Sequence, residues 1–194
     1  LTTVSGNYGA YYAFYECYHL TSVSFPNLTT VSGNSGLGYM VSYTPITSIS
    51  FPKLTTVSGS SGFQSICSHC TSLTSISFPK LTTISGSSGF QYAFYYCSSL
   101  TTVSFPELTQ NQSMYNAFSY CTSLTSISFP KLAYGRSGFQ NTFQYCSSLT
   151  TVSFPELATV DGSAFYNCFY NCTNLQTQRF PKLATIGGSA FYGS

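Results

Sequence analysis

The sequence predicts a repeat solenoid, in which coils of about 26 residues stack along one axis. The first observation is an evenly spaced Phe-Pro dipeptide, whose prolines lie 26, 27, 27, 24, 25 and 26 residues apart. The second is a motif that returns with edits along the whole chain, represented by residues 73–86. The third is an aromatic segment after each copy, as in residues 89–97. A near-constant period of this length is the signature of stacked repeats. The prolines are Pro26, Pro52, Pro79, Pro106, Pro130, Pro155 and Pro181.

Each coil is predicted to contain two short parallel β-strands joined at the Phe-Pro corner. The spacing Leu73-x-x-Ile76-x-Phe78 fits the leucine-rich-repeat pattern of apolar positions, and Leu81-x-x-Ile84 repeats its first two. Proline suits the corner because it fixes φ and donates no backbone hydrogen bond. Since side chains alternate along a strand, Ile76 and Phe78 are expected to point inward and the intervening serines outward.

The outward residues of successive coils should form straight columns, with coils about 4.8 Å apart. The first column comprises Ser22, Ser48, Ser75, Thr102, Ser126, Thr151 and Thr177. The second comprises Ser24, Ser50, Ser77, Ser104, Ser128, Ser153 and Arg179. The residues after the corner prolines form a third, in which charge signs alternate from Lys80 onward: Asn27, Lys53, Lys80, Glu107, Lys131, Glu156 and Lys182. Stacked opposite charges are modestly favourable, so this alternation also indicates stacking in register.

The aromatic segment, of the form Ala-Phe-x-x-Cys, is expected to make a short helical or 3₁₀ turn, because it is too short for a long helix. Its cysteine recurs at one position in six coils, and Tyr43 is aligned with it in the second. In-register side chains point the same way, which favours a ladder of buried thiols. At least one disulfide remains the alternative. The six cysteines are Cys17, Cys70, Cys97, Cys121, Cys146 and Cys172.

Several pieces of the sequence resemble the BspA-like (bacterial surface antigen) type of leucine-rich repeat. They are residues 186–191 (Ile-Gly-Gly-Ser-Ala-Phe), residues 160–165 (Val-Asp-Gly-Ser-Ala-Phe) and the recurring Cys-(Ser/Thr)-Ser-Leu-Thr. The resemblance covers essentially all 194 residues. It implies a surface protein that binds host or neighbouring-cell molecules. Most coils depart from the family pattern by stretching the segment between Gly and Ala-Phe, and the asparagine ladder of other leucine-rich repeats is missing.

The repeat predicts a single continuous leucine-rich-repeat solenoid of about seven coils over residues 1–194, uncapped at both ends. Open ends fit either an excerpt from a longer repeat array or copies that stack head to tail into a filament. The filament is favoured because residues 192–194 followed by residues 1–5 resemble residues 145–153. Charged residues make up only 5% of the chain, and such a low charge favours association. The net charge of +2 gives no reason to expect nucleic acid as a partner. We expect no membrane span, and no leader sequence is visible.

No enzymatic, cofactor or metal chemistry is expected. Catalysis needs acids, bases or nucleophiles that converge on one place. The chain has only four carboxylates to supply such groups: Glu16, Glu107, Glu156 and Asp161. Two of them belong to the charge column. Cys67, His69 and Cys70 look like metal ligands, but they align with positions of mixed orientation and have no fourth ligand at zinc spacing.

These observations favour an extracellular or cell-surface structural and adhesive protein whose main partner is itself, in a head-to-tail homopolymer. The alternative is a monomeric surface module that binds a protein or glycan of a host or neighbouring cell. A third possibility is ice binding, because flat faces rich in threonine serve that role in other solenoids. The candidate interaction surface comprises Tyr134, Arg136, Gln110, Gln112, Ser75, Thr102, Ser126 and Thr151.

Overall fold

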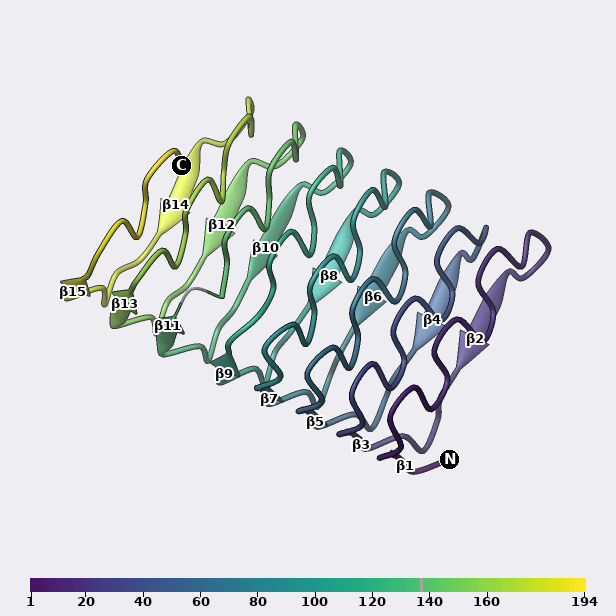
Figure 1. Ribbon diagram of the computed structural model, residues 1–194. Coiled ribbons are helices and arrows are strands. Elements are labelled where there is room, and N and C mark those ends of the chain that lie inside the picture. Colours follow the sequence, from purple (N-terminus) through teal and green to yellow (C-terminus); the bar gives the residue numbers. More distant parts are fainter. Residues whose placement is uncertain (137) are drawn as a thin grey trace.

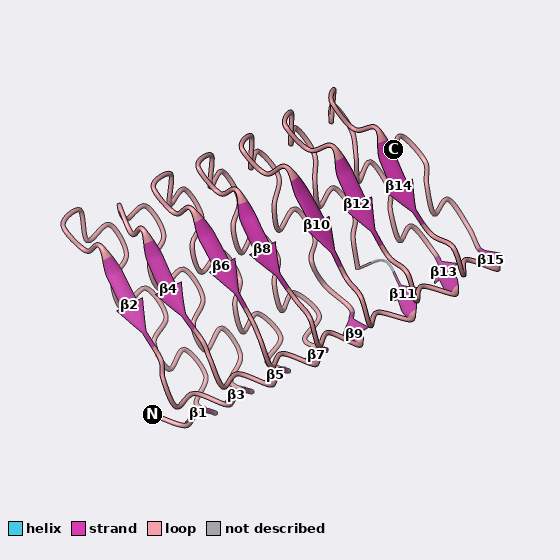
Figure 2. Cartoon of the chain, turned by 180° about the vertical axis from the view of Figure 1, so that it is seen from behind, coloured by secondary structure: helices cyan, strands magenta, loops and turns pink. Residues whose placement is uncertain are grey.

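The computed structural model describes residues 1–136 and 138–194 as a parallel β-solenoid with the two termini at opposite ends (Figure 1). The predicted fold class is therefore confirmed. The expectation of short helical or 3₁₀ turns is wrong, because the described residues form strands and turns and contain no helix (Figure 2).

One strand of each coil belongs to an eight-stranded parallel sheet that runs the length of the solenoid. In order, its strands are β1 (Thr3–Val4), β3 (Thr30–Val31), β5 (Thr56–Val57), β7 (Thr83–Ile84), β9 (Gln110–Asn111), β11 (Tyr134–Arg136), β13 (Thr159–Asp161) and β15 (Thr185–Ile186).

The other strand of each coil lies on a second side, and these strands pair in groups β2–β4, β6–β8 and β10–β12–β14. They are β2 (Ser22–Ser24), β4 (Ser48–Ser50), β6 (Ser75–Ser77), β8 (Thr102–Ser104), β10 (Ser126–Ser128), β12 (Thr151–Ser153) and β14 (Thr177–Arg179). No backbone ladder joins the described strands β4 and β6, or β8 and β10.

The predicted columns are confirmed wherever these strands pair. Ser75 pairs with Thr102, and Ser126 pairs with Thr151, in a parallel register that keeps equivalent residues side by side. The alternation also holds, because Ile76 is 3% exposed between two exposed serines. Strand β6 therefore turns its hydroxyls to solvent and its aliphatic side chain to the core, and the strands of the same composition repeat this arrangement.

Stacked phenylalanine rings fill the core behind the second side. The rings that precede the corner prolines are near-parallel, with centroid distances of 5.0 to 5.4 Å at four of the six steps. The remaining steps are Phe51–Phe78 at 5.7 Å and Phe105–Phe129 at 5.6 Å. These two wider steps coincide with the two interruptions of the sheet. The coils are therefore slightly further apart where the strand ladder is missing.

The third side of each coil is a ribbon of consecutive turns made by the aromatic segment. Along it, every second N–H closes a turn within the coil, as Cys97 N–H does to the carbonyl of Phe94. The N–H groups between them bond to the next coil, as Tyr92 N–H does to the carbonyl of Tyr115 and Tyr96 N–H to that of Ser119. The ribbon therefore ties neighbouring coils together much as a strand does.

Left-handed residues make this ribbon possible. Sixteen non-glycine residues have positive φ between 48° and 62°, and eight of them are tyrosines. They recur at every fourth position of the ribbon, as at Tyr92 and Tyr96. The left-handed conformation costs about 1–2 kcal/mol per residue and prevents a helix. In return, the N–H of most of these residues bonds to a carbonyl of the next coil, as His69 N–H does to that of Tyr95.

The cysteine column lies just inside the ribbon, and all eight cysteines of the chain are free thiols. The five buried column thiols donate to carbonyls of the preceding coil, as Cys97 Sγ does to Cys67 O at 3.1 Å, Cys121 Sγ to Phe94 O at 3.2 Å and Cys146 Sγ to Phe118 O at 3.1 Å. The thiols therefore act as hydrogen-bond donors between coils as well as small apolar groups.

Thr44, rather than Tyr43, occupies the cysteine position of the second coil. Tyr43 has φ 59° and matches the left-handed residue that precedes each cysteine. The Thr44 hydroxyl donates to the carbonyl of Val41 at 2.6 Å, as the backbone of a column cysteine does elsewhere, and it contacts Cys70 Sγ at 3.6 Å. The alignment of Tyr43 with the cysteines was wrong because the segment between the cysteine position and the next strand is one residue shorter in this coil than in the others.

Burial predicts that only one of the eight thiols reacts in the folded protein. Cys17 is exposed, whereas the other seven are buried, and burial raises the pKa of Cys97, Cys121 and Cys146 well above its ordinary value. Because the thiolate is the nucleophile, these thiols should be protected. Titration with a disulfide reagent should detect about one thiol in buffer and eight in denaturant. A denatured count lower by two would reveal a disulfide instead.

Candidate functional site

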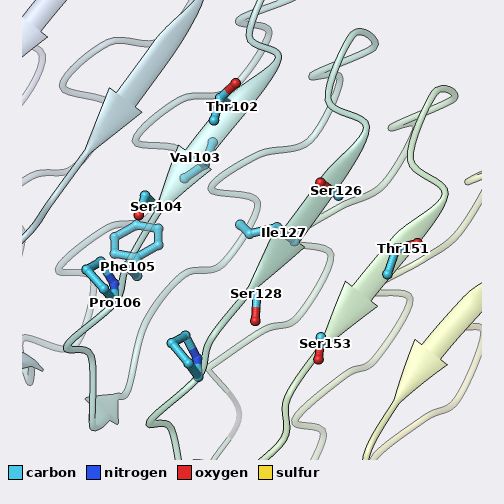
Figure 3. A pocket seen from close by; sticks show the side chains of 11 residues that line it. Thr102, Val103, Ser104, Phe105, Pro106, Ser126, Ile127, Ser128, Thr151 and Ser153 are labelled. Atoms are coloured by element: carbon cyan, nitrogen blue, oxygen red, sulfur yellow. The ribbon is translucent and has the colours of Figure 1, made fainter.

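A shallow groove on the second side collects the hydroxyl residues predicted as an interaction surface. Thr102, Ser126 and Thr151 line it, together with residues of the second column (Figure 3). Ser75 lies one coil away, paired with Thr102. The groove has a volume of about 440 Å³ and spans β8, β10 and β12. We call it the hydroxyl groove; its lining residues are Thr102, Val103, Ser104, Phe105, Pro106, Ser126, Ile127, Ser128, Pro130, Thr151 and Ser153.

The missing ladder between β8 and β10 explains why the groove lies here. Outward hydroxyls also line the other coils. The step from β8 to β10 differs because these two strands are not hydrogen-bonded to each other and because the coil here is shorter than the others. The floor contains Val103 and Ile127, and no lining residue carries a charge. Hydroxyls donate and accept hydrogen bonds, so the groove suits a neutral polar partner rather than an ion.

A column of stacked rings stands on the ribbon side. In five successive coils, the ring that precedes the column cysteine or Thr44 stacks on the next. We call these residues the ring column: Tyr43, His69, Tyr96, Tyr120 and Tyr145. Successive centroids are 4.4, 5.2, 5.2 and 4.5 Å apart, and the interplanar angles lie between 7° and 29°. Burial lowers the pKa of His69, which keeps its ring neutral at pH 7. Within the column the ring faces cover one another, so a ligand meets mainly edges and hydroxyls.

The ring column was missed by sequence reasoning, although its signal is present. A tyrosine or histidine precedes the cysteine, or its Thr44 substitute, in five successive coils. The helical interpretation of the segment hid the consequence, because packed helices lie about 8–10 Å apart, too far for equivalent rings of neighbouring coils to stack directly.

The corner between the eight-stranded sheet and the ribbon changes abruptly in the fifth coil. Five residues separate Ile84 from Phe90, but only two separate Asn111 from Met114, which occupies the position of Phe90. Both Phe90 N–H and Met114 N–H bond to the coil that follows, at the carbonyls of Ser113 and Gly138. The shorter loop leaves the surface indented at this corner.

Asn111 compensates for the missing part of this loop. In the longer loops, the N–H of Gly62 or Gly89 donates to a loop carbonyl three residues earlier, at 3.0 Å in each case. In the fifth coil, Ser113 N–H donates to Asn111 Oδ1 at 3.1 Å. Asn111 Nδ2 in turn donates to the carbonyl of Gly138 at 3.4 Å. A buried amide thus stands in an otherwise aliphatic column because its oxygen replaces a lost backbone acceptor.

This hydrogen bond predicts a measurable loss of stability on Asn111→Leu. Asn111 and Ser113 are 3% and 4% exposed, so the variant leaves a buried N–H without its acceptor. The expected loss is about 1–3 kcal/mol in the free energy of unfolding, measured by urea denaturation. Asn27→Leu, at an exposed position, should change it by less than about 0.5 kcal/mol. Equal effects of the two substitutions would contradict this role of Asn111.

The indentation brings together three of the predicted interaction residues. Gln110, Gln112 and Tyr134 line a hollow of about 350 Å³ with Thr109 and Asn111, and Gln110 pairs with Tyr134 in the sheet. We call this the corner hollow. Tyr134 is 46% exposed. Arg136 lies in β11, and its side chain lies outside the described part of the structure. These residues and those of the hydroxyl groove thus form two separate surfaces.

Two further observations concern the described residues only. They contain no cluster of three or more His, Cys, Asp or Glu side chains able to hold a metal ion. No helix long and apolar enough to cross a membrane occurs among them.

The charge column is formed as predicted, with Lys131–Glu107 and Lys182–Glu156 contacts of 2.6 Å.

Comparison with known proteins identifies the repeat. The family described as "BspA type Leucine rich repeat region" matches residues 8–92 and 64–194, in six copies. A leucine-rich repeat protein from Eubacterium ventriosum has a TM-score of 0.59 at 24% identity, covering 90% of this chain and 43% of its own. One from Bacteroides ovatus has a TM-score of 0.41 at 19% identity, covering 100% of this chain and 68% of its own. No curated protein sequence matches. The chain therefore spans less than half of the E. ventriosum protein.

Proposed function

Because the chain belongs to the BspA-type leucine-rich repeat family, we propose that it is an extracellular structural and adhesive module of a cell surface. Its copies associate head to tail, and the role is non-enzymatic. The observation that supports the association is the parallel register of the sheet, in which equivalent residues of successive coils lie side by side, as Thr3 does with Thr30 and Val160 with Ile186. A coil of a second copy can add to such a sheet by the same pairing.

The geometry supports a continuing stack. Edge strand β15 presents Ile186, which is 60% exposed although its column partner Val160 is buried. Strand β1 of a second copy would place Val4 over it, as Val31 is placed over Val4 within the chain. A contact between two different surfaces repeats without closing, which generates a filament. The near absence of charge removes the repulsion that keeps most proteins apart.

Direct imaging tests this proposal. Electron microscopy of unfixed material should show unbranched rods longer than one chain, and sedimentation should show association that rises with concentration. Ile186→Lys should abolish the rods, because a charge would be buried in the contact. Ile186→Val, which restores the residue most common in this column, should preserve them. A wild-type chain that remains monomeric at every concentration would refute the association.

The second candidate is a monomeric surface module that binds a protein or glycan of a host or neighbouring cell. The hydroxyl groove supports it, since three of its residues were predicted to interact and the groove carries no charge. Beads coated with the chain should adhere to epithelial or bacterial cells. Ser126→Arg, inside the groove, should reduce adhesion, whereas Ser48→Arg on the same face should not. Equal adhesion by both variants would exclude the groove.

A further inference from the structure

We propose that the corner hollow binds a neutral saccharide. The inference rests on the proposed role as a surface-binding module and assigns a ligand class to a place separate from the hydroxyl groove and from the end strands. Three carboxamides, one threonine and one tyrosine converge there: Asn111, Gln110, Gln112, Thr109 and Tyr134.

The first argument is the unused hydrogen-bonding capacity of Asn111. A carboxamide offers two N–H donors and two acceptor lone pairs. Within the described residues, Asn111 uses one lone pair for Ser113 N–H and one donor for the carbonyl of Gly138, the latter at 3.4 Å. The side chain is nevertheless 97% buried and lines the hollow, with one donor and one lone pair still available. A ligand with adjacent donor and acceptor groups would satisfy both.

The second argument is the chemistry of the rim. Gln110 and Gln112 are exposed, and each adds a donor and an acceptor to the edge of the hollow. Vicinal hydroxyls and acetamido groups of a sugar present the matching pattern. No lining residue carries a charge, so phosphate, sulfate or carboxylate ligands would lose water without gaining a counter-ion. The partly exposed ring of Tyr134 supplies apolar surface for the C–H face of a sugar.

Size separates a saccharide from a protein partner. The volume of about 350 Å³ lies at the small end of ligand pockets, which span about 300–1,000 Å³. A protein interface commonly involves about 20–30 residues on each side, far more than this corner offers. The hollow therefore fits one or two units of a sugar chain.

Two rim positions provide variants that remove hydrogen-bonding groups of the hollow without disturbing the solenoid. Gln110 and Gln112 occupy positions that hold Thr83 and Ser85 in the preceding coil. Gln110→Thr/Gln112→Ser therefore restores residues that the fold already accommodates. Gln176→Thr is the matched control, since it restores the threonine of its own column far from the hollow.

The test measures, by ligand-observed NMR, whether N,N′-diacetylchitobiose, cellobiose and maltose bind to the 194-residue chain. A heparin-derived disaccharide serves as the anionic comparison. We expect at least one neutral sugar to bind with a Kd of about 1 mM, and the double variant to weaken it about tenfold or more. Gln176→Thr should bind as the wild type does. Tyr134→Ala should also weaken binding.

Three results would overturn the inference. They are no binding by any neutral sugar of this panel, equal binding of the anionic disaccharide, and unchanged binding by a folded double variant. Circular dichroism confirms the folding of each variant. Rod formation and cell adhesion are measured on the same samples. A chain that adheres to cells but ignores these sugars therefore refutes the saccharide site alone, and one that does neither also refutes the surface role.

Discussion

Gly59→Ala is expected to destabilise the solenoid severely, whereas Gly6→Ala at the equivalent position of the first coil should have no effect. A methyl group on Gly59 would lie 2.1 Å from the carbonyl oxygen of Gly33 and 2.8 Å from its carbon. Both atoms belong to backbone that is held by strand β3, so neither can move away as a flexible side chain would. At Gly6, no atom lies within 4 Å of the added methyl group.

The magnitude should exceed that of ordinary overpacking. Extra methyl groups in packed cores cost about 1–3 kcal/mol, and here the clash forces two bonded coils apart, so we expect a loss of about 3 kcal/mol or more. Urea denaturation followed by circular dichroism measures it. For Gly6→Ala the free energy of unfolding should stay within about 0.5 kcal/mol of the wild type. Similar midpoints for both variants would show that the coils are not packed this closely.

Phe78→Ala is expected to cost about 3–5 kcal/mol, the usual range for removal of a buried ring. Phe78 is fully buried and stacks between Phe51 and Phe105, at centroid distances of 5.7 and 5.1 Å. It also meets Phe90 at 5.4 Å in an edge-on contact. Removal therefore breaks a stack that continues on both sides of the fourth coil.

The control is Phe14→Ala, because Phe14 is 39% exposed in the first coil. Its loss should be less than half that of Phe78, as judged by the urea midpoint. Hydrogen exchange adds a second measure: stability in a solenoid is a sum over neighbouring coils, so protection should fall most in the coils next to Phe78. A uniform fall along the whole chain would contradict this one-dimensional picture.

The strand columns were predictable because their signal is strong and local. The period, the Phe-Pro corner and the alternation around Ile76 all indicate the same register, and parallel pairing such as Ser75 with Thr102 leaves little freedom. The alternating charges after the prolines gave the same answer independently. A stack of equivalent coils therefore follows from the chain without any knowledge of distances.

The ribbon was not predictable in the same way. Apolar residues three and four apart, as in Ala93, Phe94 and Cys97, also fit a helical turn. What excludes a helix is the set of hydrogen bonds to the next coil, such as that from Tyr96 N–H to Ser119 O. Those bonds exist only after stacking, and they outweigh the cost of left-handed tyrosines. The wrong alignment of Tyr43 with the cysteines has a similar cause. The sequence alone does not show that Tyr43 has the left-handed φ of a residue preceding a cysteine, which places Thr44 at the cysteine position.

The candidate surfaces were predictable in part. Gln110 and Tyr134, predicted as interaction residues, lie together at the corner hollow, and the proline spacing of 24 residues indicates a shortened coil. Asn111 replaces an aliphatic residue of its column, but its role as a substitute acceptor for Ser113 depends on which loop residues are missing. The gap between β8 and β10 has no separate signal in the sequence.

The two interruptions of the second side have a mechanical consequence. Wherever β4 faces β6 and β8 faces β10, neighbouring coils are held by two hydrogen-bonded ladders instead of three. A chain pulled from its two ends would yield at these two steps first and unfold in blocks. In single-molecule extension, the earliest ruptures should therefore divide the chain at these steps. Unfolding that always begins at the terminal coils would argue against such fracture points.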